Sequence, residues 1–135
     1  MEERLVSEDQ DRITFGTSET AHQVLKALAL EGEEGVFSSM MDAYRFAIAL
    51  GLAIGKQTQL ANRRTVFNVG SLDKDHSLAN LITTLRPEVQ ADSVYRAAEE
   101  FAETGLAAMA PSVSLGEFRF TDMLELAKSH SQVEP

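Results

Sequence analysis

The residues of this chain that could carry chemistry are three histidines and one short run of charged and hydroxyl side chains. The histidines lie in separate segments, and none has a second histidine one helical turn away; they are His22, His76 and His130. A zinc or iron site built on them would need the fold to bring distant segments together. The sequence therefore predicts no metal site.

The charged run, residues 73–77, offers a carboxylate, an imidazole and a hydroxyl, which hydrolases combine as base, orienting group and nucleophile. Catalytic groups usually come from separate elements, because residues adjacent in sequence rarely face one another across a site. We interpret the run as a turn that leads into a helix. Asp73 and Asp75 would then favour the positive end of the helix dipole.

A second acidic group consists of Glu99, Glu100 and Glu103. On a helix Glu99 and Glu103 share a face, with Arg96 nearby, a pattern typical of a solvated, salt-bridged exterior. We therefore expect these carboxylates on the surface. The glycines form neither a P-loop nor a dinucleotide fingerprint. With no catalytic constellation and no cofactor motif, the sequence favours a non-enzymatic protein that acts by binding.

Positive charge is concentrated in the middle of the chain, although the net charge of the whole is -9. Residues 36–70 carry four basic residues and one acidic residue, and the segments on both sides are acidic. The basic residues are Arg45, Lys56, Arg63 and Arg64. They would contact phosphate or an acidic partner if they formed one patch. The alternative is an exposed loop that balances its acidic flanks.

Length and composition indicate one globular domain. The chain has 135 residues, of which 44% are hydrophobic, and no cysteine, which excludes disulfides and thiolate metal sites. The N-terminus is acidic and polar, unlike a secretory signal. The longest apolar stretch, residues 46–54, is shorter than the roughly 20 residues of a membrane span. We expect a cytoplasmic protein with no membrane partner.

The pattern of apolar residues predicts a mainly α fold with one or two short β-strands (α+β), which begins with a strand, a helix and a helix. We expect residues 1–11 to form an acidic flexible arm, 12–128 a single helical domain and 129–135 a frayed tail. Strands are predicted over 12–16 and 65–70. Helices are predicted from 17 or 18 to 31–35, from 39 to 55, over 76–85, from 92 or 93 to 109, and over 117–128.

Three further expectations concern these helices. The helix from Ser39 is apolar nearly all round, which predicts a central position or an oligomer interface. Gly51 and Gly55 either permit close helix contact or mark the end of the helix, and we favour termination at Gly55. Pro111 is expected to stop the long helix before it.

Residues 12–53 resemble a ribbon-helix-helix module, in which a short alternating strand precedes two capped helices. In that family two chains pair their strands, and the outward strand residues enter the major groove of DNA. The resemblance implies a dimeric transcriptional regulator that contacts DNA through Arg12, Thr14 and Gly16.

A more extended resemblance covers about residues 36–109. The run VFSSMMDAYRFAIALG, residues 36–51, followed by Gly55-Lys56, is similar to the signature of small proteins associated with DNA phosphorothioation (Dnd) systems. The run EEFAETGL, residues 99–106, is similar to the segment that ends the helical half of those proteins. They are bacterial accessory components encoded beside sulfur-modification and restriction genes, and no catalytic residues are assigned to them.

Our leading hypothesis rests on the second resemblance. It implies a non-enzymatic accessory protein of a bacterial DNA modification and phage-defence system, with protein components of that system as partners. DNA contact would use Arg45, Lys56, Arg63 and Arg64. A homo-oligomer is expected because the second helix is apolar on more faces than one small domain covers. The ribbon-helix-helix regulator remains the alternative.

Overall fold

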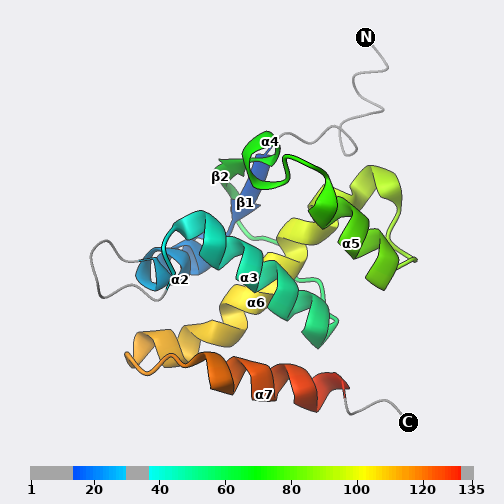
Figure 1. Cartoon of the computed structure of the whole chain (residues 1–135). Helices are drawn as coiled ribbons and strands as arrows, with labels where there is room; N and C mark the ends of the chain where they lie inside the picture. The colour runs from blue at the N-terminus through cyan, green and yellow to red at the C-terminus, as the bar shows by residue number, and fades with distance from the viewer. Residues whose placement is uncertain (1–13, 30–36, 132–135) are drawn as a thin grey trace.

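Two long helices cross at the centre of the protein, and shorter elements surround them (Figure 1). The structure is a computed structural model that describes residues 14–29 and 37–131. Its elements are β1 (Thr14–Thr17), α2 (Glu19–Leu28), α3 (Met40–Ile54), β2 (Arg64–Asn68), α4 (Val69–Leu72), α5 (Ser77–Leu85), a 3-10 turn (Ala91–Ser93), α6 (Val94–Ser114) and α7 (Phe120–Ser131). The mainly α prediction with a small β component is confirmed.

The α3–α6 pair forms the centre because glycines allow the two backbones to meet. A Cβ atom on Gly51 would lie 1.9 Å from the carbonyl oxygen of Phe101, and one on Gly105 would lie 2.1 Å from that of Ala47. Gly55 also ends α3 in the left-handed conformation, with φ of 82°. Termination of the helix at Gly55 is therefore confirmed. Close contact between helices, the alternative role for the two glycines, is made by Gly51.

The remaining helices cover the central pair on several sides. In Figure 1, α2 lies at the left, α5 at the right and α7 along the bottom. Phe46 on α3 makes ring contacts with Phe37 and with Phe120 at the start of α7. Other elements of the same chain thus cover most of the apolar surface of α3. That apolar surface alone does not require a homo-oligomer.

The small sheet forms within the chain. β1 runs antiparallel to β2, with Phe15 opposite Phe67 and an irregularity between Phe15 and Gly16. Phe15 is fully buried and packs against the rings of Tyr44 and Tyr95. A ribbon-helix-helix dimer would instead pair β1 with the same strand of a second chain.

Most helix starts agree with the sequence, and three ends do not: α2 ends at Leu28, before the predicted 31–35, while α6 and α7 extend to Ser114 and Ser131. Ser18 and Ser39 cap α2 and α3 by accepting hydrogen bonds from Ala21 N and Asp42 N. The prediction that Pro111 stops the long helix is wrong: α6 continues to Ser114. Pro111 itself is exposed, whereas Met109 is buried and Val113 packs against the core, so burial sustains the helix past the proline.

The boundaries of the domain also shift at the C-terminal end. Residues 129–131 belong to α7, so the frayed tail predicted over 129–135 is wrong for this part. Residues 132–135 and the predicted arm over 1–11 lie outside the described residues. The second strand starts one residue earlier than predicted and ends at Asn68, because Val69 and Gly70 begin the short helix α4.

Candidate functional site

Two of the four predicted basic contact residues are held by acids of the same chain around β2. Arg63 Nε donates to both carboxylate oxygens of Glu99 at 3.0 and 3.1 Å, and its Nη2 donates to the carbonyl oxygen of Thr14 at 3.0 Å. Arg64 Nη1 lies 2.6 Å from Glu19 Oε1. A hydrogen bond from Gln23, and then the bond and charge of Arg64, hold the pKa of Glu19 below its usual value.

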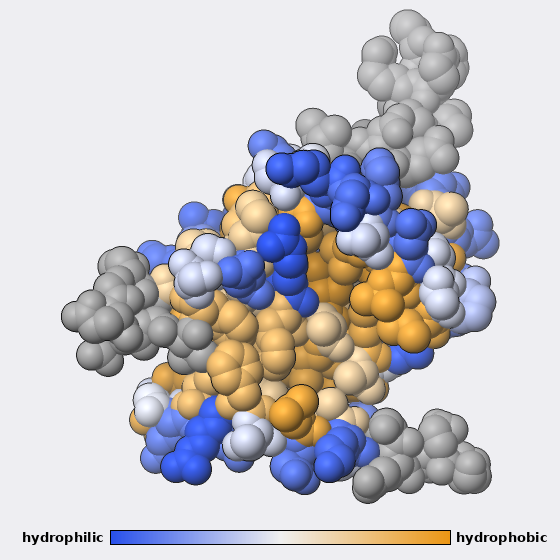
Figure 2. Space-filling model, viewed as in Figure 1, coloured by the Kyte–Doolittle hydropathy of each residue, from blue (hydrophilic) through white to orange (hydrophobic). Residues whose placement is uncertain are grey.

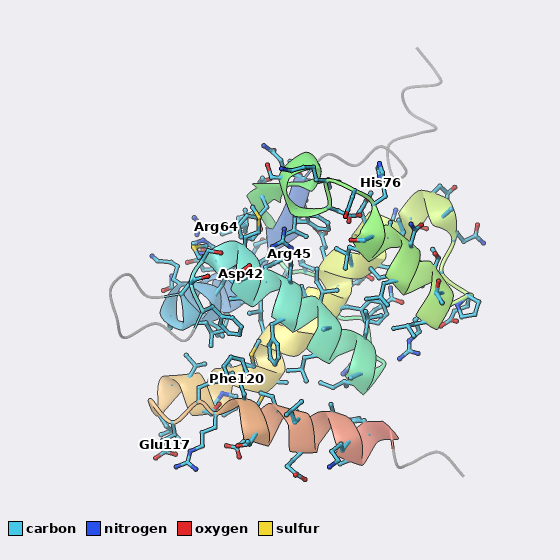
Figure 3. The ribbon with its side chains drawn as sticks, viewed as in Figure 1. Asp42, Arg45, Arg64, His76, Glu117 and Phe120 are labelled. Atoms are coloured by element: carbon cyan, nitrogen blue, oxygen red, sulfur yellow. The ribbon has the colours of Figure 1, made fainter. Side chains whose placement is uncertain are left out.

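The other two basic residues lie on or beyond α3. Arg45 contacts Asp42 at 3.3 Å and donates to the carbonyl oxygen of Leu72 at 3.1 Å (Figure 3). Lys56 is exposed just past the end of α3, and its carbonyl oxygen accepts a bond from Thr104. The three arginines thus serve separate local contacts, an arrangement unlike the single phosphate-binding patch that the charge distribution suggested.

The glutamates of α6 contradict our expectation of a solvated exterior. Glu99 is 4% exposed and accepts the backbone N–H of Gly16 at 2.8 Å. Glu103 is 9% exposed and accepts the N–H and the hydroxyl of Ser18. Backbone donors at the β1–α2 junction point at α6, and the two carboxylates satisfy them. The sequence did contain a signal for the burial of Glu99 and Glu103, because the apolar residues Ala102 and Leu106 lie on the same helix face.

The interpretation of residues 73–77 as a turn and helix cap is confirmed. Asp73 is buried, and its two oxygens accept the backbone N–H groups of Leu78 and Ala79 at 2.8 and 3.1 Å. The hydroxyl of Tyr95 donates to the same carboxylate at 2.6 Å. Burial, and then this bond, raise the pKa of Tyr95. The carboxylate is thus engaged in fixing the start of α5.

An apolar groove between α3 and α5 is the surface that our sequence interpretation missed. It has a volume of about 440 Å³ and is visible as a hollow between these helices in Figure 2. Its lining residues are Arg45, Ile48, Ala49, Leu52, Leu72, Asp73, Ser77, Leu78 and Leu81. Leu81 is 46% exposed, and Leu85, one turn further along α5, is 50% exposed.

The sequence signal for this groove was present in α5. The helix over 76–85 was predicted from its apolar residues Leu78, Leu81, Ile82 and Leu85. In the structure Ile82 is fully buried, whereas Leu81 and Leu85 are about half exposed. The four side chains share one stripe about 100° wide, of which the side with Ile82 is buried and the side with Leu81 borders the groove.

No family model, curated protein or solved structure matches this chain.

Metal-binding and membrane-spanning features are not found in the part of the chain that the structure describes. Over residues 14–29 and 37–131, no three His, Asp or Glu side chains gather closely enough to hold a metal ion. None of the described helices has both the length and the apolar character needed to cross a bilayer. The groove remains as the feature best suited to recognition, because it combines an apolar floor with an arginine at its rim.

Proposed function

We propose that this chain is a cytoplasmic, non-enzymatic accessory protein of a bacterial DNA modification and phage-defence system of the phosphorothioation type. It works by binding a protein of that system in the groove between α3 and α5. The observation that carries the proposal is the exposed apolar surface of the groove, which Leu81 and Leu85 extend beyond its rim. Apolar surface of this kind on a globular protein is a usual mark of a recognition site.

The family resemblance supports the choice of system. Its two segments, residues 36–56 and 99–106, are far apart in sequence, and they contribute the closest part of the α3–α6 pair. Gly51 lies against Phe101, and Gly105 lies against Ala47. The resembling residues therefore build the scaffold, and one wall of the groove is the outer side of that scaffold.

Direct contact with DNA is the weaker part of the hypothesis. Arg45, Arg63 and Arg64 each bond to an acid of the same chain, and the net charge opposes approach to a phosphate backbone. The ribbon-helix-helix alternative loses support in the same way. One edge of β1 pairs with β2, and Glu99 and Tyr44 bond to the peptide groups of Gly16.

The test is genetic and uses the native host. We expect disruption of the gene to lower the phosphorothioate content of genomic DNA, measured by mass spectrometry, or to raise the plating efficiency of phage. Complementation with the wild-type gene should restore both, and complementation with Leu81→Asp should not. Leu124→Asp is the matched control, because Leu124 is also an exposed leucine, at 58% against 46% for Leu81, and lies on α7 outside the groove. A disruption without effect on either readout would reject the proposal.

A further inference from the structure

We infer that two copies of this chain exchange α7 and so form a domain-swapped dimer, in which α7 of each copy packs against α3 of the other. In such a dimer the contacts of the exchanged helix are kept, and only the segment that links it to the rest of the chain changes conformation. The occupant of the vacated surface is known, because α7 itself covers that surface in the monomer. The groove between α3 and α5 takes no part, so the exchange does not depend on the proposed function.

Apolar contacts alone hold α7 in place. Its main contact is with α3, and Met123 is the only buried residue over 120–130. The rings of Phe120, at the start of α7, and Phe46 on α3 have their centroids 5.5 Å apart (Figure 3). In the part of the chain that the structure describes, no side chain of 120–130 forms a hydrogen bond or an ion pair with another element. α7 can therefore leave α3 without breaking a polar contact.

A hinge of five residues, 115–119, links α6 to α7. Leu115 still has helical angles, with φ of -86° and ψ of -5°. Gly116 then turns the chain with φ of 70°, and it is the only hinge residue with a positive φ. Glycine adopts left-handed, helical and extended conformations about equally readily. One residue thus maintains the turn, and it opposes opening of the hinge only weakly.

The hinge makes little contact with the rest of the protein. A hollow of about 500 Å³ beside it is lined by hinge residues 116–119 and by Asp122. A Cβ on Gly116 would meet nothing within 4 Å. Phe118 is partly buried, and the other hinge residues are exposed. Opening the hinge therefore sacrifices little packing.

An exposed leucine in the hinge gains a partner in the dimer. Leu115 is 71% exposed, more than the other exposed large hydrophobic residues of the described chain. Five residues reach at most about 17 Å when extended, so two copies that exchange α7 must lie against each other at their hinges. The hinges cross at the two-fold axis, and Leu115 of the two copies can then be buried together.

The charges of the hinge are complementary to those of a second hinge. Glu117, at the outer edge of the molecule in Figure 3, and Arg119 lie on either side of Phe118. Neither side chain forms an ion pair within the described residues. In an antiparallel crossing centred on Phe118, Glu117 of each copy faces Arg119 of the other. The hinge is neutral as a whole, so the net charge of -9 on each copy is not concentrated there.

The first experiment measures the monomer–dimer equilibrium of the full chain by sedimentation. Protein concentrations run from about 10 µM to about 1 mM, with about 150 mM salt to screen the net charge. The decisive variant is Gly116→Ala, because alanine at φ of 70° is strained although its Cβ has room. We expect this variant to strengthen dimerisation at least about tenfold, since the open hinge relieves the strain in both copies.

A second glycine provides the matched control. A Cβ on Gly70 also meets nothing within 4 Å, and the φ of Gly70 is not positive. Gly70→Ala should therefore leave the monomer–dimer equilibrium at its wild-type value. Circular dichroism melting of both variants verifies that they are folded.

The second experiment identifies the exchanged element. Isotope-labelled and unlabelled chains are unfolded together, refolded as a mixture and concentrated, and isotope-filtered NOEs then report contacts between copies. We expect the contact between the rings of Phe46 and Phe120 to join different copies in the dimer and to stay within one chain in the monomer. The chain has no cysteine, so disulfide exchange cannot create the dimer.

Three results would overturn the exchange of α7. One is a dimer fraction in Gly116→Ala that equals that of Gly70→Ala, absence of dimer in both included. Another is a dimer in which the contact between Phe46 and Phe120 stays within one chain. The third is a dimer that Leu81→Ser dissociates, which would place the interface at the groove between α3 and α5. Each of these results leaves the proposed function intact, because its test is the genetic disruption.

Discussion

Glu99 and Glu103 hold the N-terminal strand and the first helix against α6 by accepting hydrogen bonds from Gly16 N and Ser18 N. Such carboxylates are costly to bury and become stable where every oxygen is satisfied. Glu99 meets this condition with Gly16 N and with the guanidinium of Arg63. Its side chain is 5% exposed and that of Arg63 is 30% exposed, so solvent screens this pair only in part.

We expect Glu99→Gln to lower the free energy of unfolding by about 2–3 kcal/mol, because an amide N–H₂ would replace the carboxylate oxygen that faces Arg63 Nε. Urea denaturation provides the measurement. Glu100→Gln is the control, since Glu100 bonds at the surface to Gln57 and should change stability by less than about 0.5 kcal/mol. Equal effects of the two substitutions would contradict the role assigned to Glu99.

His22 on α2 makes the stability depend on pH. Burial, and then the charges of Arg64 and Lys26, lower its pKa below 6.5. The folded state therefore resists a proton that the unfolded state accepts, so stability falls as the pH decreases from 6.5 toward the folded pKa. Glu19 and Asp75 affect stability in a separate, more acidic pH range, because their pKa values are lowered from 4.5 and 3.8.

The expected result is a melting temperature that declines between about pH 7.5 and about pH 5.5 in the wild type and declines less in His22→Gln. Thermal melts followed by circular dichroism at constant ionic strength measure this difference. His130→Gln, at an exposed position on α7, should retain the wild-type slope. An unchanged slope in His22→Gln would show that other groups control the transition.

At the scale of elements, the α3–α6 contact has no room for a side chain at its two glycines. We expect Gly51→Ala and Gly105→Ala each to lower the free energy of unfolding by about 3 kcal/mol or more, because the new Cβ would overlap backbone atoms of the facing helix. Denaturation of purified variants, or their failure to accumulate, is the readout.

The glycine of α4 provides the matched control. A Cβ on Gly70 meets nothing within 4 Å, and alanine is the better helix former. Gly70→Ala should leave the stability unchanged or raise it by up to about 1 kcal/mol. If Gly51→Ala behaved like Gly70→Ala, the close approach of α3 and α6 would be refuted.

The elements that the sequence predicted well are those with local determinants. Ser18 and Ser39 bond to backbone groups three residues ahead, and Gly55 adopts its left-handed conformation at the end of its own helix. These signals lie within one helical turn of the boundary that they set. Residues separated by so few positions can be recognised in the sequence as motifs.

The features that the sequence predicted poorly depend on distant partners. Glu99 and Gly16 are 83 residues apart in sequence. The helical pattern of α6 alone cannot reveal that the peptide group of Gly16 lies against the helix face that carries Glu99. The sequence left open whether the basic residues form one patch, because charge along the chain says nothing about pairing across it. The groove depends on the separation of α3 and α5, which the packing of both helices around α6 determines.

At the scale of the whole molecule, the ion pairs around β2 lie apart from the groove between α3 and α5. The acids near the centre engage the N-terminal strand and the arginines around it, while the apolar surface lies between α3 and α5 (Figure 2).

The same distribution bears on DNA. We expect no measurable binding of duplex DNA at about 150 mM salt, because the net charge of -9 opposes approach to the phosphate backbone. Fluorescence anisotropy with a labelled duplex, repeated at low salt, is the test. Any low-salt binding should weaken in the double variant Lys56→Gln, Arg64→Gln and persist in Arg12→Ala, Thr14→Ala. Tight, salt-resistant binding that the second variant abolishes would instead establish the ribbon-helix-helix regulator, and would require β1 to leave its pairing with β2.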